Sequence, residues 1–171
     1  MKKFEILIDT YKDKIDEFLL SLDGIKEVHI KEDKWKTDIN ILYNDKNISI
    51  IDIKDKLIEY VDAVNVPSIL SFNKFEEKNI NKEIFLGDGC CEYCMNGTIE
   101  ELLEIDGINS ASYEDGKDFF NVTLKLGYNP DKVNNEKLGQ IIKELQVSIF
   151  KICIQIYWQN FKICISLYVA W

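Results

Sequence analysis

The chain has 171 residues, of which 46% are hydrophobic and 12% aromatic, enough for packed cores in one large domain or two small ones. It carries 30 acidic and 21 basic residues, for a formal net charge of −9. Because nucleic-acid phosphates bind clustered Lys and Arg, this charge and the absence of a long basic stripe argue against a nucleic-acid partner. Cations and basic protein surfaces fit better.

Residues 1–8 alternate charged and apolar side chains and contain no apolar core of the kind that a signal peptide needs. We therefore expect a cytoplasmic protein whose thiols are reduced. The chain has five cysteines, none of them within residues 1–89. An odd number with this distribution fits poorly with a secreted disulfide framework.

An internal repeat organises the chain. Asp-Gly-Ile occurs at residues 23–25 and again at 106–108, an offset of 83 residues. Similar patterns of apolar residues surround the two copies, so each element expected around the first has a counterpart around the second. We therefore expect two units of the same design.

The first unit opens with alternating apolar residues over 4–8, which predict a strand. Thr10 is the expected N-cap of the helix that follows, with Asp13 three residues later. A hairpin is expected to turn near 32–34, and a fourth strand near 63–71. The two helices of this unit are predicted from apolar stripes made of Ile15, Phe18, Leu19 and Leu22, and of Ile53, Leu57 and Tyr60.

The second unit repeats this order. A strand is expected at 84–86, and a hairpin with its turn at Asp115-Gly116. The apolar stripes of its two helices are Met95, Ile99, Leu102 and Leu103, and Leu138, Ile142 and Leu145.

Each unit therefore has the order β-α-β-β-α-β, which predicts an α+β protein made of tandem ferredoxin-like βαββαβ sandwiches. We expect a first domain at 1–71, a linker at 72–82 and a second domain at 83–171.

The last 25 residues, 147–171, contain no acidic residue and alternate apolar side chains on both sides of Gln159-Asn160. The parity of the alternation changes at this pair, which predicts a hairpin and so a C-terminal β extension. A helix is the rival interpretation. Lys, Gln and Asn interrupt the segment, which argues against a transmembrane span, although a tail this apolar could instead contact a partner or a membrane.

Three cysteines, Cys90, Cys91 and Cys94, lie within five positions, at the start of the first helix expected in the second unit. Cysteines three residues apart at the start of a helix can direct both sulfurs at one ion, and the helix N-terminus favours the thiolate. Soft sulfur ligands select Cu(I), Zn, Cd or Hg over hard cations. We expect Cys91 and Cys94 to bind the metal, and Cys90 could complete a three-coordinate site.

The second unit resembles the heavy-metal-associated domain, found in copper chaperones, mercuric-ion binding proteins and metal-pumping P-type ATPases. The matching features span about 83–146 and are Asp88-Gly89-Cys90-Cys91-Glu92-Tyr93-Cys94, the apolar helix, Gly107-Ile108 and Tyr128-Asn129-Pro130. Two features depart from the family pattern. Gly89 stands where the family usually has Met, and Leu145-Gln146 where it often has an aromatic or basic residue.

The resemblance implies a metallochaperone-type protein that carries Cu(I), with Zn(II) or Cd(II) as the other candidates. It would pass the ion to a metal-transporting ATPase or another acceptor protein. The first unit has no cysteine in its corresponding loop and is expected to be a metal-free copy.

Two other functions stay open: thiol-disulfide exchange at the same cysteine pair, and sensing or protein interaction by a fold that hosts many functions. Nothing in the sequence predicts an enzyme, because no nucleophile-base pair or phosphate loop is found. Cys153 and Cys164 are expected to pack as small hydrophobic residues, and His29 to face solvent on a strand.

Overall fold

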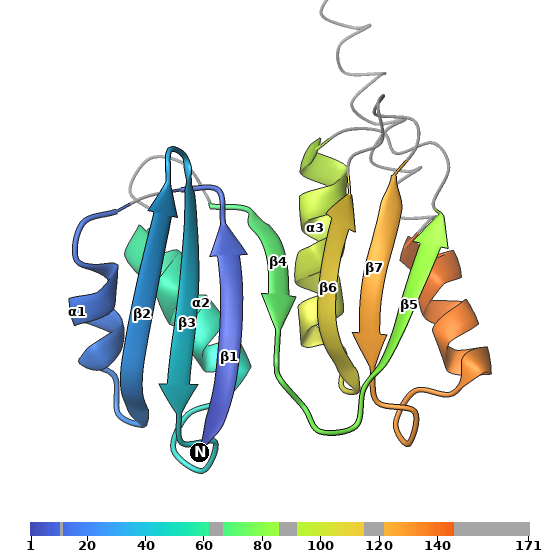
Figure 1. Cartoon of the computed structure of the whole chain (residues 1–171), viewed down its shortest axis with the longest axis horizontal. Coiled ribbons are helices and arrows are strands. Elements are labelled where there is room, and N and C mark those ends of the chain that lie inside the picture. Colours follow the sequence, from blue (N-terminus) through green and yellow to red (C-terminus); the bar gives the residue numbers. More distant parts are fainter. Residues whose placement is uncertain (11, 62–66, 86–91, 115–121, 146–171) are drawn as a thin grey trace, which may run out of the picture.

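The structure is a computed structural model, and it describes residues 1–10, 12–61, 67–85, 92–114 and 122–145. These residues form a mixed α+β fold with a seven-stranded antiparallel sheet and four helices (Figure 1). The strands are β1 (Lys2–Ile8), β2 (Ile25–Asp33), β3 (Lys36–Tyr43), β4 (Ile69–Asn73), β5 (Ile80–Phe85), β6 (Ile108–Glu114) and β7 (Thr123–Tyr128). The helices are α1 (Ile15–Leu20), α2 (Ile50–Val61), α3 (Glu92–Glu104) and an unlabelled helix over 135–145.

The strands lie in the order β2-β3-β1-β4-β6-β7-β5, and each pairing in this sheet is antiparallel. The first half of the chain, residues 1–79 with the connection that follows β4, supplies the four strands from β2 to β4. The second half, residues 80–145, supplies β6, β7 and β5. The pairing of β4 with β6 joins the two halves into one sheet.

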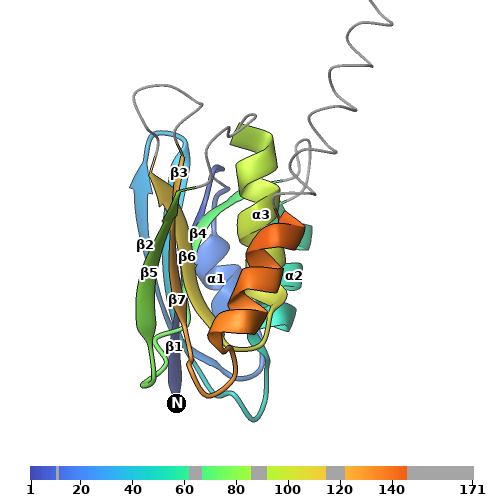
Figure 2. The same cartoon turned by 90° about the vertical axis from the view of Figure 1, so that its right-hand side faces the viewer.

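All four helices lie on one face of the sheet, so the described part of the protein has two layers (Figure 2). The core lies between these layers. Alternate residues of β1 and β3 point into it and are fully or almost fully buried: Phe4, Ile6 and Ile8, with Ile39, Ile41 and Tyr43. The other face of the sheet carries no helix among the described residues.

The amphipathic stripe predicted for the helix of α3 is confirmed, because Met95, Ile99, Leu102 and Leu103 are all buried. In α2, Ile53 and Leu57 are buried as expected. Helices with one apolar stripe of this kind pack against a sheet with that stripe inward. The periodicity of the sequence therefore placed the core side of both helices correctly.

The predicted start of the first helix is wrong. Thr10 is not its N-cap: α1 begins at Ile15, after Lys14 in the left-handed conformation (φ 66°), and no side chain caps it. The Thr10 carbonyl instead accepts a hydrogen bond from the hydroxyl of Thr37 on β3. Contacts made across the sheet therefore took precedence over the local capping pattern.

Four other expectations differ from the structure in their bounds or concern residues that lie partly or wholly outside the described ones. The fourth strand of the first half is β4, which begins at Ile69 rather than near residue 63, and residues 62–66 lie outside the described residues. The Asp115-Gly116 turn and the C-terminal β extension at 147–171 also lie outside them. Within the predicted linker 72–82, residues 74–79 connect β4 to β5.

Candidate functional site

The predicted cysteine site lies at the start of α3. Glu92 is the first residue of this 13-residue helix and Cys94 is the third. The structure describes only the backbone of Cys94, and Cys90 and Cys91 lie outside the described residues. The start of α3 and the end of β5 lie at the same end of the sheet (Figure 1). Backbone N–H groups in the first turn of a helix lack intrahelical partners and favour a nearby negative charge, such as a thiolate.

A partly buried hydrogen bond connects the first turns of α3 to β6. The hydroxyl of Tyr113 donates to Oδ1 of Asn96 at 2.6 Å, and Asn96 is 5% exposed. Asn96 follows Cys94 by two residues, so this bond fixes the segment of the helix that contains the Cys94 backbone. The sequence did not predict this pair. The signal in the sequence is a polar residue, Asn96, directly beside Met95 of the apolar stripe. An amide buried at such a position requires a hydrogen-bond partner.

The corresponding loop of the first half, between β1 and α1, is closed by hydrogen bonds of its own. The carboxylate of Asp9 accepts from the backbone N–H of Ser68 at 2.7 Å. Tyr60 of α2 donates its hydroxyl to the carbonyl of Asp13 at 3.0 Å, and Lys12 donates to the Tyr60 carbonyl and lies over the Tyr60 ring. This loop holds α1 to α2 and offers no thiol.

Within the described residues, no group of three or more His, Cys, Asp or Glu side chains is placed to hold a metal ion. Two of the three cysteines predicted as ligands lie outside that part of the chain. Cys153 and Cys164 lie outside it as well.

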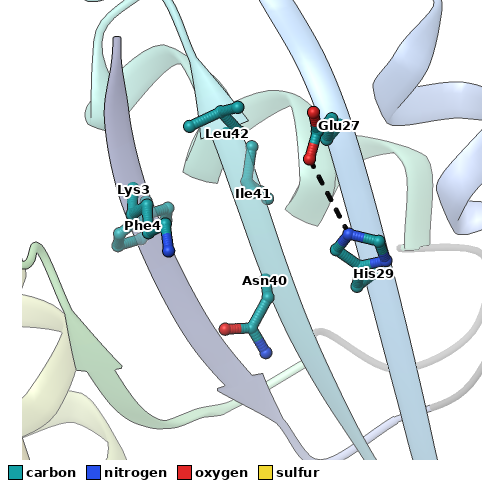
Figure 3. A pocket seen from close by; sticks show the side chains of 7 residues that line it. All are labelled: Lys3, Phe4, Glu27, His29, Asn40, Ile41 and Leu42. Carbon is teal, nitrogen blue, oxygen red and sulfur yellow. Dashed lines mark ion pairs between the residues drawn. The ribbon is translucent and has the colours of Figure 1, made fainter.

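A shallow cavity of about 290 Å³ lies on the helix-free face of the sheet (Figure 3). His29 of β2 lines it, with its Nε2 3.9 Å from a carboxylate oxygen of Glu27. The His29 side chain is 80% exposed, which confirms the prediction that it faces solvent. Asn40 and Lys3 on the neighbouring strands complete the polar part of the lining. These four side chains come from one open surface and form no enclosed binding site.

No protein family model matches the chain, and no curated protein matches it. The chain is similar to a solved structure, the N-terminal soluble domains of Bacillus subtilis CopA, at 16% identity. The similarity covers 84% of this chain and 89% of that one, with a TM-score of 0.32. A TM-score this low does not establish a common fold. No helix among the described residues is both long and apolar enough to span a membrane.

Proposed function

We propose that this protein binds a soft metal ion through Cys91 and Cys94 and delivers it to an acceptor protein. The observation that supports the proposal is the start of α3, where the helix begins at Glu92. One cysteine therefore directly precedes the helix and the other lies in its first turn. Two thiols in these positions can approach one ion from the loop and from the helix.

The chemistry of the ligands favours Cu(I). Two thiolates suit its low coordination number, whereas a structural zinc site uses four ligands. Zn(II) and Cd(II) are the other candidates, and Cys90 would supply a third sulfur to them. The two-thiolate site leaves the ion accessible, which suits transfer from one thiol pair to another better than permanent retention.

We further infer that the chain consists of two ferredoxin-like units, at 1–71 and 83–171, joined by a linker at 72–82. The order of elements supports this inference: β1-α1-β2-β3-α2-β4 is followed by β5-α3-β6-β7 and the helix over 135–145. On this interpretation the second unit is a heavy-metal-associated domain. The first unit would have the same architecture without the thiols.

The acceptor we propose is a protein with a basic docking surface, such as a metal-transporting ATPase, because the chain has a formal charge of −9. Attraction of this kind accelerates docking and weakens as salt is added. The protein would act as a carrier and not as an enzyme.

The test is an anaerobic titration of the full chain with Cu(I), Zn(II) and Cd(II), each against a competing chelator. We expect Cys91→Ser and Cys94→Ser each to abolish tight binding, because a hydroxyl is a poor ligand for a soft ion. Cys90→Ser separates the two coordination modes. It should leave Cu(I) affinity unchanged if two sulfurs bind the ion, and lower it if three do.

Cys153→Ser with Cys164→Ser is the matched control, since it removes two thiols outside the motif and should leave the stoichiometry intact. Metal binding that survives the combined Cys91→Ser and Cys94→Ser substitutions would refute the proposal. A measurable disulfide reductase turnover of the parent chain would favour thiol-disulfide exchange instead.

A further inference from the structure

The joint between the two halves is a run of main-chain pairing that lies next to α3. The paired residues of β4 and β6 are Ser71 with Ser112, Phe72 with Ala111 and Asn73 with Ser110. One residue further on, the N–H of Lys74 donates to the carbonyl of Asn109 at 2.7 Å. Helix α3 packs against β4 of the first half as well as against its own β6 (Figure 1). The helix that carries Cys94 therefore spans the joint.

A buried lysine of the first half contacts the side of α3. Lys54 of α2 is only 5% exposed, and its Nζ lies 2.6 Å from Oε1 of Glu104 and 3.4 Å from Oε1 of Glu100. Its neighbour Asp55 lies 3.1 Å away. Burial by itself would lower the pKa of Lys54, but the hydrogen bonds and charges of Glu104 and Asp55 outweigh it and raise the pKa.

This cluster favours one orientation of α3. Glu100 and Glu104 are one helical turn apart, so they face α2 together. A lysine that is this deeply buried is tolerated when anions surround it. If α3 rotated or slid along the sheet, the two carboxylates would leave the Lys54 ammonium group, which would then be buried without them.

A second lysine from the first half holds the last turn of the helix. The Nζ of Lys74, just after β4, donates to the carbonyl of Leu103 at 2.8 Å. The last four carbonyls of a helix have no partner within the helix, and a cation placed there is also attracted to the negative end of the helix dipole. Lys54 and Lys74 thus hold α3 from its side and from its C-terminal end.

We propose that the cysteine-free first half is a positioning partner for the metal site: through Lys54 and Lys74 it fixes the orientation of the helix that carries Cys94. The first half would then contribute to metal affinity without contacting the ion. The functional part of this inference rests on the proposed metal binding, and the geometric part does not.

The geometric part is tested on the metal-free full chain by residual dipolar couplings of the backbone amides. In the parent chain, the amides of the first half and of α3 should fit one alignment tensor. In the combined Lys54→Met and Lys74→Met variant, the α3 couplings should depart from the tensor fitted to the first half. Lys56→Met is the matched control, because Lys56 lies exposed on the same helix. Couplings of α3 that are unchanged in the combined variant would overturn the proposal.

The functional part is tested by the Cu(I) affinity of the same variants against a competing chelator. We expect the combined variant to bind about 2-fold to 30-fold more weakly, the range found for coupling through packed networks, and Lys54→Arg to retain the parent affinity. Equal affinities in the parent and the combined variant would overturn this part. If the parent itself binds no metal, the proposed function fails, while the coupling experiment still decides the positioning role.

If the combined variant does not fold, circular dichroism will reveal it. A second variant then replaces it, with Lys54→Met, Glu100→Gln and Glu104→Gln together. Removing Lys54 together with both glutamates leaves no buried charge without a counter-ion, because the remaining Asp55 is exposed, and such replacements are often neutral for stability. The same departure of the α3 couplings is expected, and its absence would contradict the proposal.

Discussion

A glycine with positive φ forms the same turn in each half of the chain. Gly24 and Gly107 both adopt positive φ, 98° and 92°, and their carbonyls accept hydrogen bonds of 2.8 Å from the N–H groups of Asn44 and Asn129. These glycines belong to the two Asp-Gly-Ile copies. Each turn therefore anchors the start of a hairpin to the end of that hairpin, and only a residue without a Cβ fits it well.

Gly107→Ala should destabilise the fold by about 1–3 kcal/mol, because Ala tolerates positive φ poorly. Its Cβ would also lie 2.7 Å from the Cβ of Lys132 and 2.8 Å from Cγ2 of Val133. The measurement is the free energy of unfolding in urea.

Gly97→Ala is the matched control for that substitution. Gly97 lies within α3, and beyond its own helix no atom of the described residues lies within 4 Å of the place a Cβ would take. This variant should gain about 0.5–1 kcal/mol from helix propensity. Equal effects of the two substitutions would contradict the role assigned to the turn.

At the scale of elements, the second helix of each half is capped by the residue that precedes it. Ser49 and Asp52 form a reciprocal capping box at the start of α2: the N–H of Asp52 donates to Oγ of Ser49 at 3.1 Å, and the N–H of Ser49 donates to Asp52 at 3.2 Å. Asn134 accepts from the N–H of Lys137 at 2.8 Å at the start of the helix over 135–145. These caps satisfy backbone donors that a helix start leaves free.

Ser49→Ala should lower the free energy of unfolding by about 1 kcal/mol, the usual cost of losing an N-cap. Ser49→Asn, which keeps a capping oxygen, should retain most of the stability. Chemical denaturation of the three proteins at neutral pH measures both effects. An Asn variant that is as unstable as the Ala variant would contradict the capping role.

The same box predicts a dependence on pH. The side-chain and backbone hydrogen bonds from Ser49 lower the pKa of Asp52 below its ordinary 3.8. A carboxylate whose pKa is lower in the folded state stabilises the fold above its unfolded pKa and loses that contribution as pH falls through the folded pKa. The difference between the parent and Ser49→Ala should therefore shrink in acid.

At the scale of the whole molecule, the two halves share a sheet, and a buried lysine, Lys54, and a half-buried one, Lys74, lie where they meet. Lys54 retains its charge among carboxylates, whereas burial lowers the pKa of Lys74 to about 8, against the opposing charges of Asp106 and Glu76. Burial, with Glu76 and Asp45, also raises the pKa of Tyr43 to about 12. Lys74, at the joint, and Tyr43, on β3 outside it, are therefore two groups through which the stability should respond to alkaline pH.

We expect the free energy of unfolding to rise between pH 8 and pH 10, because the unfolded chain still binds a proton on Lys74 that the folded chain has released. Above pH 10 the sign should reverse, since Tyr43 then ionises in the unfolded chain before it does in the folded one. Lys74→Met should remove the rise. Urea denaturation across this range is the measurement, and a rise that persists in Lys74→Met would assign it to another group.

Local patterns in the sequence predicted most of the elements. Alternating apolar residues located β1, and the apolar stripe located α3. The start of α1 was predicted wrongly, because Thr10 satisfies its backbone through Thr37, a residue far along the chain. For the site, the sequence predicted the helix that is found as α3, and the metal-binding cysteines stay a prediction. The Asn96 and Tyr113 pair came only from the structure.

The sequence by itself therefore determined what depends on neighbours along the chain: periodicity, turns and the thiols at a helix start. Tertiary structure alone decided how the two halves join, that β4 pairs with β6, and that Lys54 meets Glu100 and Glu104 on another helix. The physical reason is that edge-strand pairing and charge burial depend on residues distant in sequence. The main-chain N–H and C=O groups of an edge strand can pair with those of another strand, and no local sequence pattern specifies which strand that will be.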